Sequence, residues 1–416
     1  MILIVTAIAS NLVSDLQQIV DATAAKYNCS VSLGIRMPGD ETYTVAGGIV
    51  VADGSVAAKP TDKYAWGSVT KTITGAAILR RVADGHLGLD DNASTYIDPM
   101  LKAASYPYPT MKELFSADHW SIPPAVQYPA SDVTIRHLLH MVSGIPDYDT
   151  DAYRHLQYTH AATGFSPLDI FDYVHGPLMF KPGGPIPSSG SHKSSTNYCS
   201  VNFILLGMVL ANRAGAKSWD AYEQSEILPT ALKWRIQFAG LDDLCDLTAP
   251  VHGYDRQSYA AMSSGGAFDV SAINCLGGWT AGNVVMDAQA AADWTYALFG
   301  PDAEVIPADF VKAMVNFTSY GLATFNFDGR YANGTRGVSH GHLGDTYGFT
   351  STVAYFPAVN VSIAVATNLE EGQAMPSEVN CLAYNRLLDE IDGRSVPRQC
   401  QYATQSYYGG KCECSG

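Results

Sequence analysis

The chain has 416 residues, of which 47% are hydrophobic and 16% charged, and its 25 basic and 40 acidic side chains give a formal net charge of −15. This length exceeds what one simple core usually holds, so we expect two subdomains or one elaborated domain. The negative charge argues against nucleic acid and anionic membranes as partners. No apolar run reaches the roughly 20 residues that a membrane-spanning helix requires.

The N-terminal part predicts a helix, a hairpin and a second helix. Residues 1–10 are apolar but short and lack a basic flank, which fits the remnant of a signal peptide or a first strand or helix. Apolar positions recur at helical spacing over residues 12–27. Residues 31–35 and 42–46 alternate in polarity around a Pro-Gly-Asp turn, which is typical of a hairpin. A further helical pattern begins near residue 69.

The rest of the chain predicts a helical middle followed by strands. Residues 103–132 are rich in Tyr and Pro without a clear period, so we predict a long ordered loop there. Apolar periodicity predicts further helices at residues 134–141, 167–175, 202–213, 281–299 and 376–391. Alternating patterns predict strands at residues 339–344, 350–356 and 361–367.

These elements predict an α+β fold. We infer an antiparallel sheet made from both ends of the chain and flanked by the N- and C-terminal helices, with an all-helical lobe between them. The expected division is a sheet subdomain at 1–66 and 280–395, a mainly helical subdomain at 67–279, and a Cys-rich tail at 396–416.

One polar segment at the start of a predicted helix combines a serine and a lysine. In Trp66-Gly67-Ser68-Val69-Thr70-Lys71, the lysine follows the serine by three residues, so both lie on one helix face. A hydroxyl at a helix N-terminus beside an amine is what an activated nucleophile needs. The alternative is that Ser68 caps the helix and Lys71 is a solvated charge, and an isolated S-x-x-K does not decide between them.

Further short motifs follow this segment in a definite order. They are Leu89-Asp90-Asp91, Thr134-Ile135-Arg136-His137-Leu138-Leu139, Ser143-Gly144-Ile145-Pro146-Asp147-Tyr148, Pro182-Gly183, Tyr198-Cys199-Ser200, Leu205-Leu206-Gly207, Gly277-Gly278, Gly341-His342-Leu343-Gly344 and Tyr347-Gly348-Phe349. With them the chain resembles the serine β-lactamase-like superfamily over nearly its whole length, in particular its class C β-lactamase, D-alanyl-D-alanine carboxypeptidase, D-aminopeptidase and esterase branch. The resemblance implies a β-lactamase/transpeptidase-like fold and a cofactor-free serine hydrolase.

The resemblance implies a role for each matching residue. Ser68 would be the nucleophile that forms an acyl-enzyme, Lys71 would help to take its proton, and Tyr198 would pass a proton to the leaving group. His342 matches the first position of a strand motif that faces the nucleophile across the cleft. The backbone N–H groups of Ser68 and Asp345 would form the oxyanion hole. The residues expected to contact the substrate are Trp66, Ser200 and Gly344.

The chain departs from the family pattern at two of these positions. The usual Tyr-x-Asn reads Tyr198-Cys199-Ser200, and a shift by one helical turn would instead align Ser195-Thr196-Asn197 as a Ser-x-Asn motif. An asparagine there typically contacts a substrate amide, so Ser200 favours esters or unusual amides over β-lactams or peptidoglycan. His342 in place of lysine points the same way, because histidine is mostly neutral at neutral pH.

We therefore expect a secreted hydrolase of small esters or amides with an acyl-Ser68 intermediate. The alternatives are a D-amino-acid peptidase, a penicillin-binding-type carboxypeptidase or a β-lactamase, an acyltransferase with the same residues, and a non-catalytic scaffold of the same fold. The oligomeric state stays open.

Two other motifs have competing interpretations. Residues 337–341 fit the G-x-S-x-G elbow of α/β-hydrolases, but the one later histidine follows too closely to complete that triad. His340 and His342 would share one face of a strand, yet no further His/Asp cluster accompanies them, so we expect no metal.

Cysteines and glycosylation motifs favour the secretory pathway of a eukaryote. The chain has eight cysteines, and Cys400, Cys412 and Cys414 indicate a tail held by disulfides whose pairing the sequence does not give. Cys412-Glu413-Cys414 lacks the spacing of a zinc site. The asparagines of N-x-S/T sequons are Asn28, Asn92, Asn316, Asn333 and Asn360.

Overall fold

The computed structural model describes residues 2–121, 127–161, 163–174, 176–186, 197–241, 245–258, 265–274, 278–372 and 374–400. The expectations that involve Ser195, Thr196, Gly277, Cys412 and Cys414 fall outside these residues.

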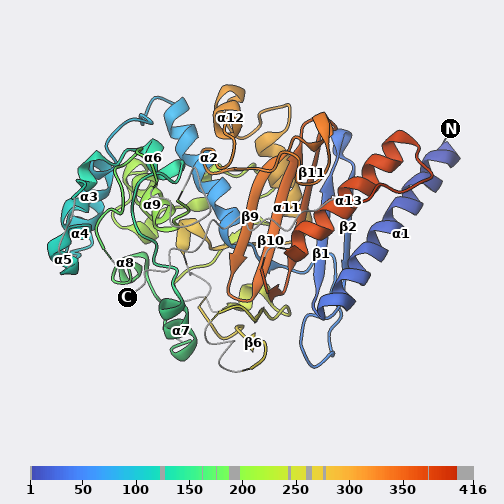
Figure 1. The fold of residues 1–416 in the computed structure, drawn as a ribbon, viewed down its shortest axis with the longest axis horizontal. Coiled ribbons are helices and arrows are strands. Elements are labelled where there is room, and N and C mark those ends of the chain that lie inside the picture. Colours follow the sequence, from blue (N-terminus) through green and yellow to red (C-terminus); the bar gives the residue numbers. More distant parts are fainter. Residues whose placement is uncertain are drawn as a thin grey trace.

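A six-stranded antiparallel sheet joins the two ends of the chain, with strand order β2-β1-β11-β10-β9-β8 (Figure 1). The predicted hairpin forms β1 (Val31–Arg36) and β2 (Thr42–Gly47), and the predicted later strands form β9 (His340–Thr346), β10 (Phe349–Phe356) and β11 (Val361–Thr367). The short strand β8 (Phe325–Asn326) closes one edge, and β1 pairs with β11 in the middle of the sheet. The predicted α+β class and antiparallel sheet are therefore confirmed.

Helices cover both faces of this sheet (Figure 1). On one face lie α1 (Ile2–Tyr27) and α13 (Ala374–Asp392), and Phe356 of β10 stacks on Tyr384 of α13 at 3.6 Å between ring centroids. The other face carries α11 (Ala288–Phe299). Small residues let α11 lie close, since a Cβ at Gly34 would stand 2.3 Å from the carbonyl oxygen of Ala288. Ser362 donates to the carbonyl of Ala292 at 2.7 Å on the same face.

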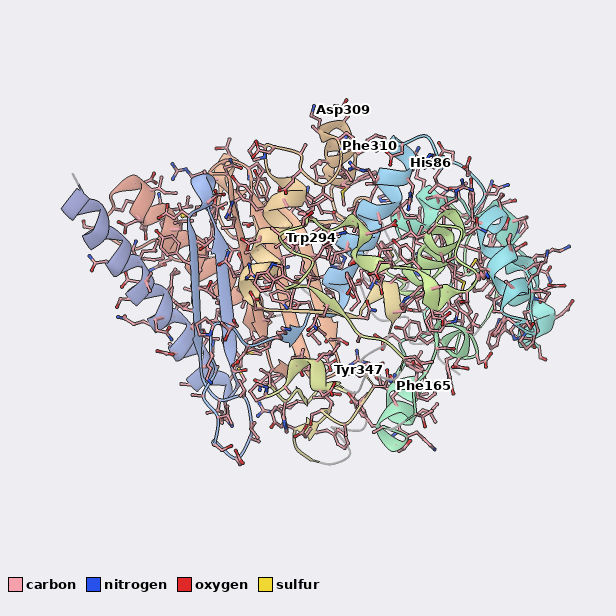
Figure 2. The ribbon with its side chains drawn as sticks, turned by 180° about the vertical axis from the view of Figure 1, so that it is seen from behind. His86, Phe165, Trp294, Asp309, Phe310 and Tyr347 are labelled. Atoms are coloured by element: carbon pink, nitrogen blue, oxygen red, sulfur yellow. A yellow bond between two sulfur atoms is a disulfide. The ribbon has the colours of Figure 1, made fainter. Side chains whose placement is uncertain are left out.

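Most of the remaining helices form a lobe on the far side of α2 (Thr70–Ala83) in Figure 1. The members of this lobe are α3 (Ser94–Ala103), α4 (Met111–Leu114), α5 (Ala117–Trp120), α6 (Ile135–Leu139), α7 (Asp151–Thr159), α8 (Pro167–Phe171) and α9 (Val201–Arg213). Trp294 of α11, labelled in Figure 2, donates its indole N–H to Thr72 of α2 at 2.9 Å. This bond ties α2 to the sheet layer.

Two small sheets and several short helices complete the described chain. One small sheet has the order β3 (Tyr64–Ala65), β7 (Val284–Met286), β4 (Gln237–Phe238), and the other β12 (Leu369–Glu370), β5 (Tyr254–Asp255), β6 (Phe268–Asp269). The other helices are α12 (Ala308–Val315), η1 (Pro38–Asp40), η2 (Gly67–Val69), η3 (Ala130–Asp132), η4 (Trp219–Ala221), η5 (Gln224–Ile227), η6 (Cys245–Thr248), η7 (Trp279–Ala281) and η8 (Gly334–Gly337). None of the described helices is both long and apolar enough to span a bilayer.

Two predicted segments differ from the structure, and one helix was not predicted. The loop expected at residues 103–132 contains α4 and α5, whose first turns are capped by Thr110 and Ser116. Helix α3 was missed because Pro99 interrupts its pattern. The helix expected at 281–299 begins only at Ala288, where Asp287 accepts from the N–H of Ala290. Its apolar start is the buried strand β7, which periodicity alone does not separate from a buried helix.

The described cysteines are partly paired. Cys381 of α13 forms a disulfide with Cys400, which fixes the start of the C-terminal tail to α13. Cys29 and Cys199 are free and buried.

Candidate active site

Ser68 lies in η2, the turn that leads into α2. It is the one residue between Tyr64 and Leu79 that is not buried, so the chain presents this hydroxyl to solvent from an otherwise buried segment. The residue before it, Gly67, has φ +49°, a conformation that favours glycine. The N-cap of α2 is Val69, without a side-chain cap. Ser68 is therefore not the cap of this helix, contrary to the simpler alternative.

Lys71 is fully buried and points at Ser68. Its Nζ donates to Ser68 Oγ at 2.8 Å, to the carbonyl oxygen of Ala281 at 2.9 Å and to Ser200 Oγ at 3.4 Å. These contacts use the three N–H groups of an ammonium. When the amine is neutral, two N–H groups can keep the contacts to Ala281 and Ser200 while the lone pair faces Ser68. Lys71 is thus no solvated charge, and its geometry suits a base for the Ser68 proton.

Two opposing effects set the pKa of Lys71. Burial lowers the pKa of Lys71 from its ordinary value of 10.5 to about 7, although the charges of Asp147 and Asp149 act to raise it. Burial in turn raises the pKa of Asp147, assisted by Asp149. The Asp147 carboxylate accepts from the N–H of Ser200 at 3.0 Å, which holds it at the start of α9 beside the amine. A large fraction of Lys71 is therefore unprotonated at neutral pH.

Tyr198 brings a phenol to the same place from the segment before α9. Its hydroxyl is hydrogen-bonded to Ser68, and its ring lies 5.1 Å from Lys71 Nζ. Phe325 stacks on this ring with centroids 5.8 Å apart. Burial raises the pKa of Tyr198 well above 10, and the bond with Ser68 offsets this only in part. The phenol therefore keeps its proton and serves as a donor. This contact supports the alignment on Tyr198; the alternative motif lies partly outside the described residues.

His342 lies behind Tyr198. It is fully buried, with ring centroids 6.2 Å apart between the two side chains. Its Nδ1 is 2.5 Å from the carbonyl oxygen of Leu343, so Nδ1 carries the hydrogen and Nε2 accepts from the Tyr320 hydroxyl at 3.0 Å. Burial and the nearby Lys71 lower the pKa of His342 to about 3. Contrary to expectation, this buried imidazole does not face the nucleophile across an open cleft. It is neutral, as expected for a histidine at neutral pH.

The second predicted oxyanion donor, the main-chain N–H of Asp345, belongs to the end of β9. Thr346 is paired with Phe349 across the two-residue turn of the β9–β10 hairpin. In such a hairpin the residues next to the turn form the hydrogen-bonded pair, so we expect the main-chain N–H of Asp345 to point away from β10. There it meets η2: a Cβ at Gly67 would lie 2.9 Å from the Asp345 nitrogen. The N–H groups of Ser68 and Asp345 thus come from adjoining segments, as an oxyanion hole requires.

The structure corrects one of the predicted substrate contacts. The Trp66 side chain is fully buried and donates to the carbonyl of Met286 at 2.9 Å, so it belongs to the core. A Cβ at Gly344 would lie 2.1 Å from the Trp66 carbonyl oxygen and 2.1 Å from Ser351 Oγ. Gly344 is therefore needed for the packing of η2 on β9, and its substrate contact remains a prediction. Ser200 lies beside Lys71, as described above, and its substrate contact remains a prediction.

Some residues of the site were not assigned from the sequence. Asp147 belongs to the motif at residues 143–148, and an acidic side chain within a motif of the family pattern is a sequence signal for a residue of the site. The carbonyl of Ala281 and the hydroxyl of Tyr320 gave no signal, because a main-chain acceptor and a core tyrosine look ordinary in a sequence. Ser339 of the G-x-S-x-G match is buried before a strand, so it is no nucleophile elbow. Among the described residues no group of three or more His, Cys, Asp or Glu side chains could hold a metal.

A family model described as beta-lactamase matches residues 16–380. The chain belongs to the beta-lactamase family. This confirms the family inferred from the motifs. The S-x-x-K segment, the Tyr198 motif and the end of β9 all lie within the matched part of this beta-lactamase family protein.

Solved structures share the fold of this beta-lactamase family protein. A D-stereospecific amidohydrolase from Streptomyces sp. is 20% identical with a TM-score of 0.64, over 88% of this chain and 97% of that chain. D-amino acid amidase from Ochrobactrum anthropi SV3 is 18% identical with a TM-score of 0.65, over 92% of this chain and 99% of that chain. A penicillin binding protein from Bacillus halodurans is 18% identical with a TM-score of 0.61, over 89% and 98%. At these identities the likeness concerns the fold alone.

Proposed function

We propose that this beta-lactamase family protein is a serine hydrolase that cleaves small esters and amides through an acyl-Ser68 intermediate. The observation that carries the proposal is the contact of Lys71 Nζ with Ser68 Oγ at 2.8 Å, made by a buried amine whose pKa lies near 7. A base poised near the working pH is what general base catalysis needs. The hydrogen bond of Tyr198 to the same hydroxyl adds the donor for the leaving group.

The proposed reaction has two balanced steps. Ser68 Oγ attacks the carbonyl carbon and gives its proton to the neutral amine of Lys71. The negative charge that forms on the carbonyl oxygen is stabilised by the N–H groups of Ser68 and Asp345. Tyr198 gives its proton to the departing alkoxide or amine, and Lys71 restores that proton. Water then attacks the ester of Ser68 with the same groups as base and acid, releasing a carboxylic acid and free Ser68.

The charges of the site favour substrates whose acyl part carries no free carboxylate. The neutral, buried His342 offers no cation that would bind one. This speaks against the carboxypeptidase and β-lactamase alternatives, in which the position is typically a lysine. The relatives named D-amino acid amidase and D-stereospecific amidohydrolase support amides as a substrate class. We therefore place D-amino acid amides and simple esters first among substrates.

Covalent labelling tests the nucleophile. Intact-mass spectrometry after a fluorophosphonate probe is expected to show one adduct, and peptide mapping is expected to place it on Ser68. The Ser68→Ala variant is expected to stay unlabelled and inactive. Wild-type protein that is folded but unlabelled would refute the enzyme and favour a non-catalytic scaffold.

A substrate panel tests the class. The panel comprises p-nitrophenyl esters of increasing acyl length, D- and L-amino acid amides, a D-Ala-D-Ala peptide and a cephalosporin. We expect burst kinetics with the esters, turnover of the amides, and no turnover of the two carboxylate-bearing substrates. Turnover of the D-Ala-D-Ala peptide at a rate above the esters would contradict the argument from His342.

We also propose that the protein passes through a secretory pathway. The Cys381–Cys400 disulfide supports this, as do the exposed positions of Asn28, Asn92, Asn316 and Asn333. Asn360 is only half-buried and accepts from the Tyr355 hydroxyl. Treatment of the native protein with an N-glycosidase is expected to lower its mass; an unchanged mass would argue against glycosylation at all five sequons.

A further inference from the structure

A buried ion pair connects the helical lobe with the sheet beside the oxyanion site. Arg154 of α7 is 4% exposed, and its Nε lies 2.9 Å from Asp149 Oδ1. Its Nη1 donates to Glu370, a fully buried residue of β12. The guanidinium therefore binds one carboxylate from the helical lobe, that of Asp149, and one from strand β12, that of Glu370.

Glu370 also fixes the tip of the β9–β10 hairpin. Its Oε2 accepts from the N–H of Gly348 in the turn at 2.9 Å. Tyr347, the other turn residue, lies on the α7 side of the molecule in Figure 2 and donates to Gln157 of α7. The Arg154 guanidinium lies 5.8 Å from the Tyr347 ring centroid. The end of β9 is thus anchored to α7 through side chains that meet at this tip.

The carboxyl group of Asp345 meets that of Glu370. Gln257 Nε2 donates to Asp345 Oδ2 at 3.1 Å and to Glu370 Oε1 at 3.2 Å, so both groups surround one amide. The two carboxyl side chains are hydrogen-bonded to each other, which requires a proton on one of them. The remaining oxygen, Asp345 Oδ1, is buried, and no N–H or O–H donor of the described residues reaches it. A proton shared by the carboxyl groups of Asp345 and Glu370 would give this oxygen the hydrogen bond that it lacks.

The charges around the pair also require a proton. Arg154 is the guanidinium that faces it, whereas Asp149 and Asp255 add two further carboxyl groups. The phenols nearby are Tyr158, which donates to Asp255, and Tyr347. Asp149 is 35% exposed, but ionised Asp255, Asp345 and Glu370 would still place three carboxylates around one buried guanidinium and leave uncompensated buried charge. Burial raises the pKa of both Glu370 and Asp345, and Arg154 does not offset it.

We propose that Asp345 and Glu370 share one proton, and that this carboxyl pair, held by Arg154, positions the main-chain N–H of Asp345 for the oxyanion. The positioning half rests on the proposed function, because an oxyanion forms only if Ser68 acylates. Glu370 and Arg154 are positioning residues: they act through Asp345, and the proposal assigns them no contact with the substrate.

Infrared spectroscopy tests the shared proton without any catalysis. At neutral pH the wild-type protein is expected to show the carbonyl band of a protonated carboxyl group, shifted in D₂O. Glu370→Gln and Asp345→Asn each place an N–H donor between the two groups, so each variant is expected to remove that same band. The control is Glu371→Gln, next in sequence, whose surface pair with Arg256 at 3.0 Å carries no shared proton. A wild-type band unaffected by both variants, or no such band at all, would overturn the proposal.

Steady-state kinetics with a p-nitrophenyl ester test the positioning role. Glu370→Ala is expected to lower kcat on the order of 10²-fold, as loss of one oxyanion donor does, with little change in KM. Glu370→Gln is expected to recover most of this loss, and Glu371→Ala to match wild type. All variants are compared below their unfolding midpoints by circular dichroism, so that lost stability is not read as lost catalysis. Equal kcat in Glu370→Ala and Glu371→Ala would overturn the positioning role. Absence of wild-type turnover would refute the hydrolase and leave the infrared result standing.

Discussion

Lys71 is the proposed base because it is buried and its hydrogen bonds go to Ser68, Ser200 and the carbonyl of Ala281, none of which is a carboxylate. Its pKa of about 7 predicts that kcat/KM rises with pH through about 7 and then levels off, since only the neutral amine accepts the Ser68 proton. Tyr198 keeps its proton throughout this range. Ester hydrolysis measured from pH 5 to 9 checks this profile. A rise centred near pH 10 would mean that the amine stays charged and that another group is the base.

The negative charge of Asp147 acts on the pKa of Lys71, and a substitution that removes only this charge isolates the effect. Its carboxylate raises the pKa of Lys71, so Asp147→Asn is expected to move the rise in kcat/KM to lower pH. The amide oxygen can still accept from the N–H of Ser200, which preserves the start of α9. The pH profile of this variant, set beside that of wild type, checks the direction. A shift to higher pH would contradict the electrostatic coupling.

Tyr198 is predicted to act after the attack, on the leaving group. Tyr198→Phe keeps the ring that stacks on Phe325 and removes the hydroxyl bonded to Ser68. We expect a loss on the order of 10²–10⁴ in kcat for amides, whose leaving groups need a proton, and a smaller loss for p-nitrophenyl esters. Parallel kinetics on one amide and one ester check this difference. Equal losses on both would place the phenol in the attack step instead.

At the scale of elements, the site depends on how closely η2 packs on β9. Gly344→Ala would drive a Cβ to 2.1 Å from the Trp66 carbonyl oxygen, and this must separate the two segments. We expect a lower unfolding midpoint, from about 1–3 kcal/mol of overpacking, and a fall in kcat on the order of 10²-fold as the two oxyanion donors move apart. Gly266→Ala is the control, because a Cβ there meets open space. Normal kcat in Gly344→Ala would show that the oxyanion donors do not depend on this contact.

The sequence predicts those elements whose residues carry a periodic pattern or a motif. The hairpin β1–β2, the helix after Ser68 and strands β9 to β11 follow from alternation and spacing, and Ser68, Lys71 and Tyr198 follow from the family resemblance. The sequence does not predict which of the site side chains are buried. Trp66 was expected at the substrate and His342 facing the nucleophile across the cleft, and both are fully buried instead, because tertiary packing decides which face of a segment meets solvent. The Asp345–Glu370 contact joins residues of two strands whose register no local pattern specifies.

At the scale of the molecule, polar contacts near the site link the helical lobe and α2 to the sheets. Trp294 joins α11 to α2, and Arg154 joins α7 to β12. The Ser68 hydroxyl and the Asp345 N–H come from segments on opposite sides of this junction. Their relative position therefore depends on the packing of the lobe against the sheet, and the fold carries the cost of burying Lys71 beside Ser68.

That cost is testable as a dependence of stability on pH. The unfolded chain binds the Lys71 proton up to about pH 10.5, whereas the folded protein releases it near pH 7, so burial of this lysine destabilises the fold fully below pH 7 and progressively less towards pH 10.5. Lys71→Met removes this proton. It also leaves the carbonyl of Ala281 without its donor, an offset that does not vary with pH.

We therefore expect the unfolding midpoint of Lys71→Met, relative to wild type, to be highest at or below pH 7 and to decline as the pH approaches 10. Lys102→Met, on the exposed face of α3, is the control and is expected to show no such trend. Calorimetry of the three proteins between pH 6 and 10 measures the difference. A midpoint difference that stays constant, or grows with pH, would mean that the amine is charged in the folded protein, and the proposed base would lose its physical support.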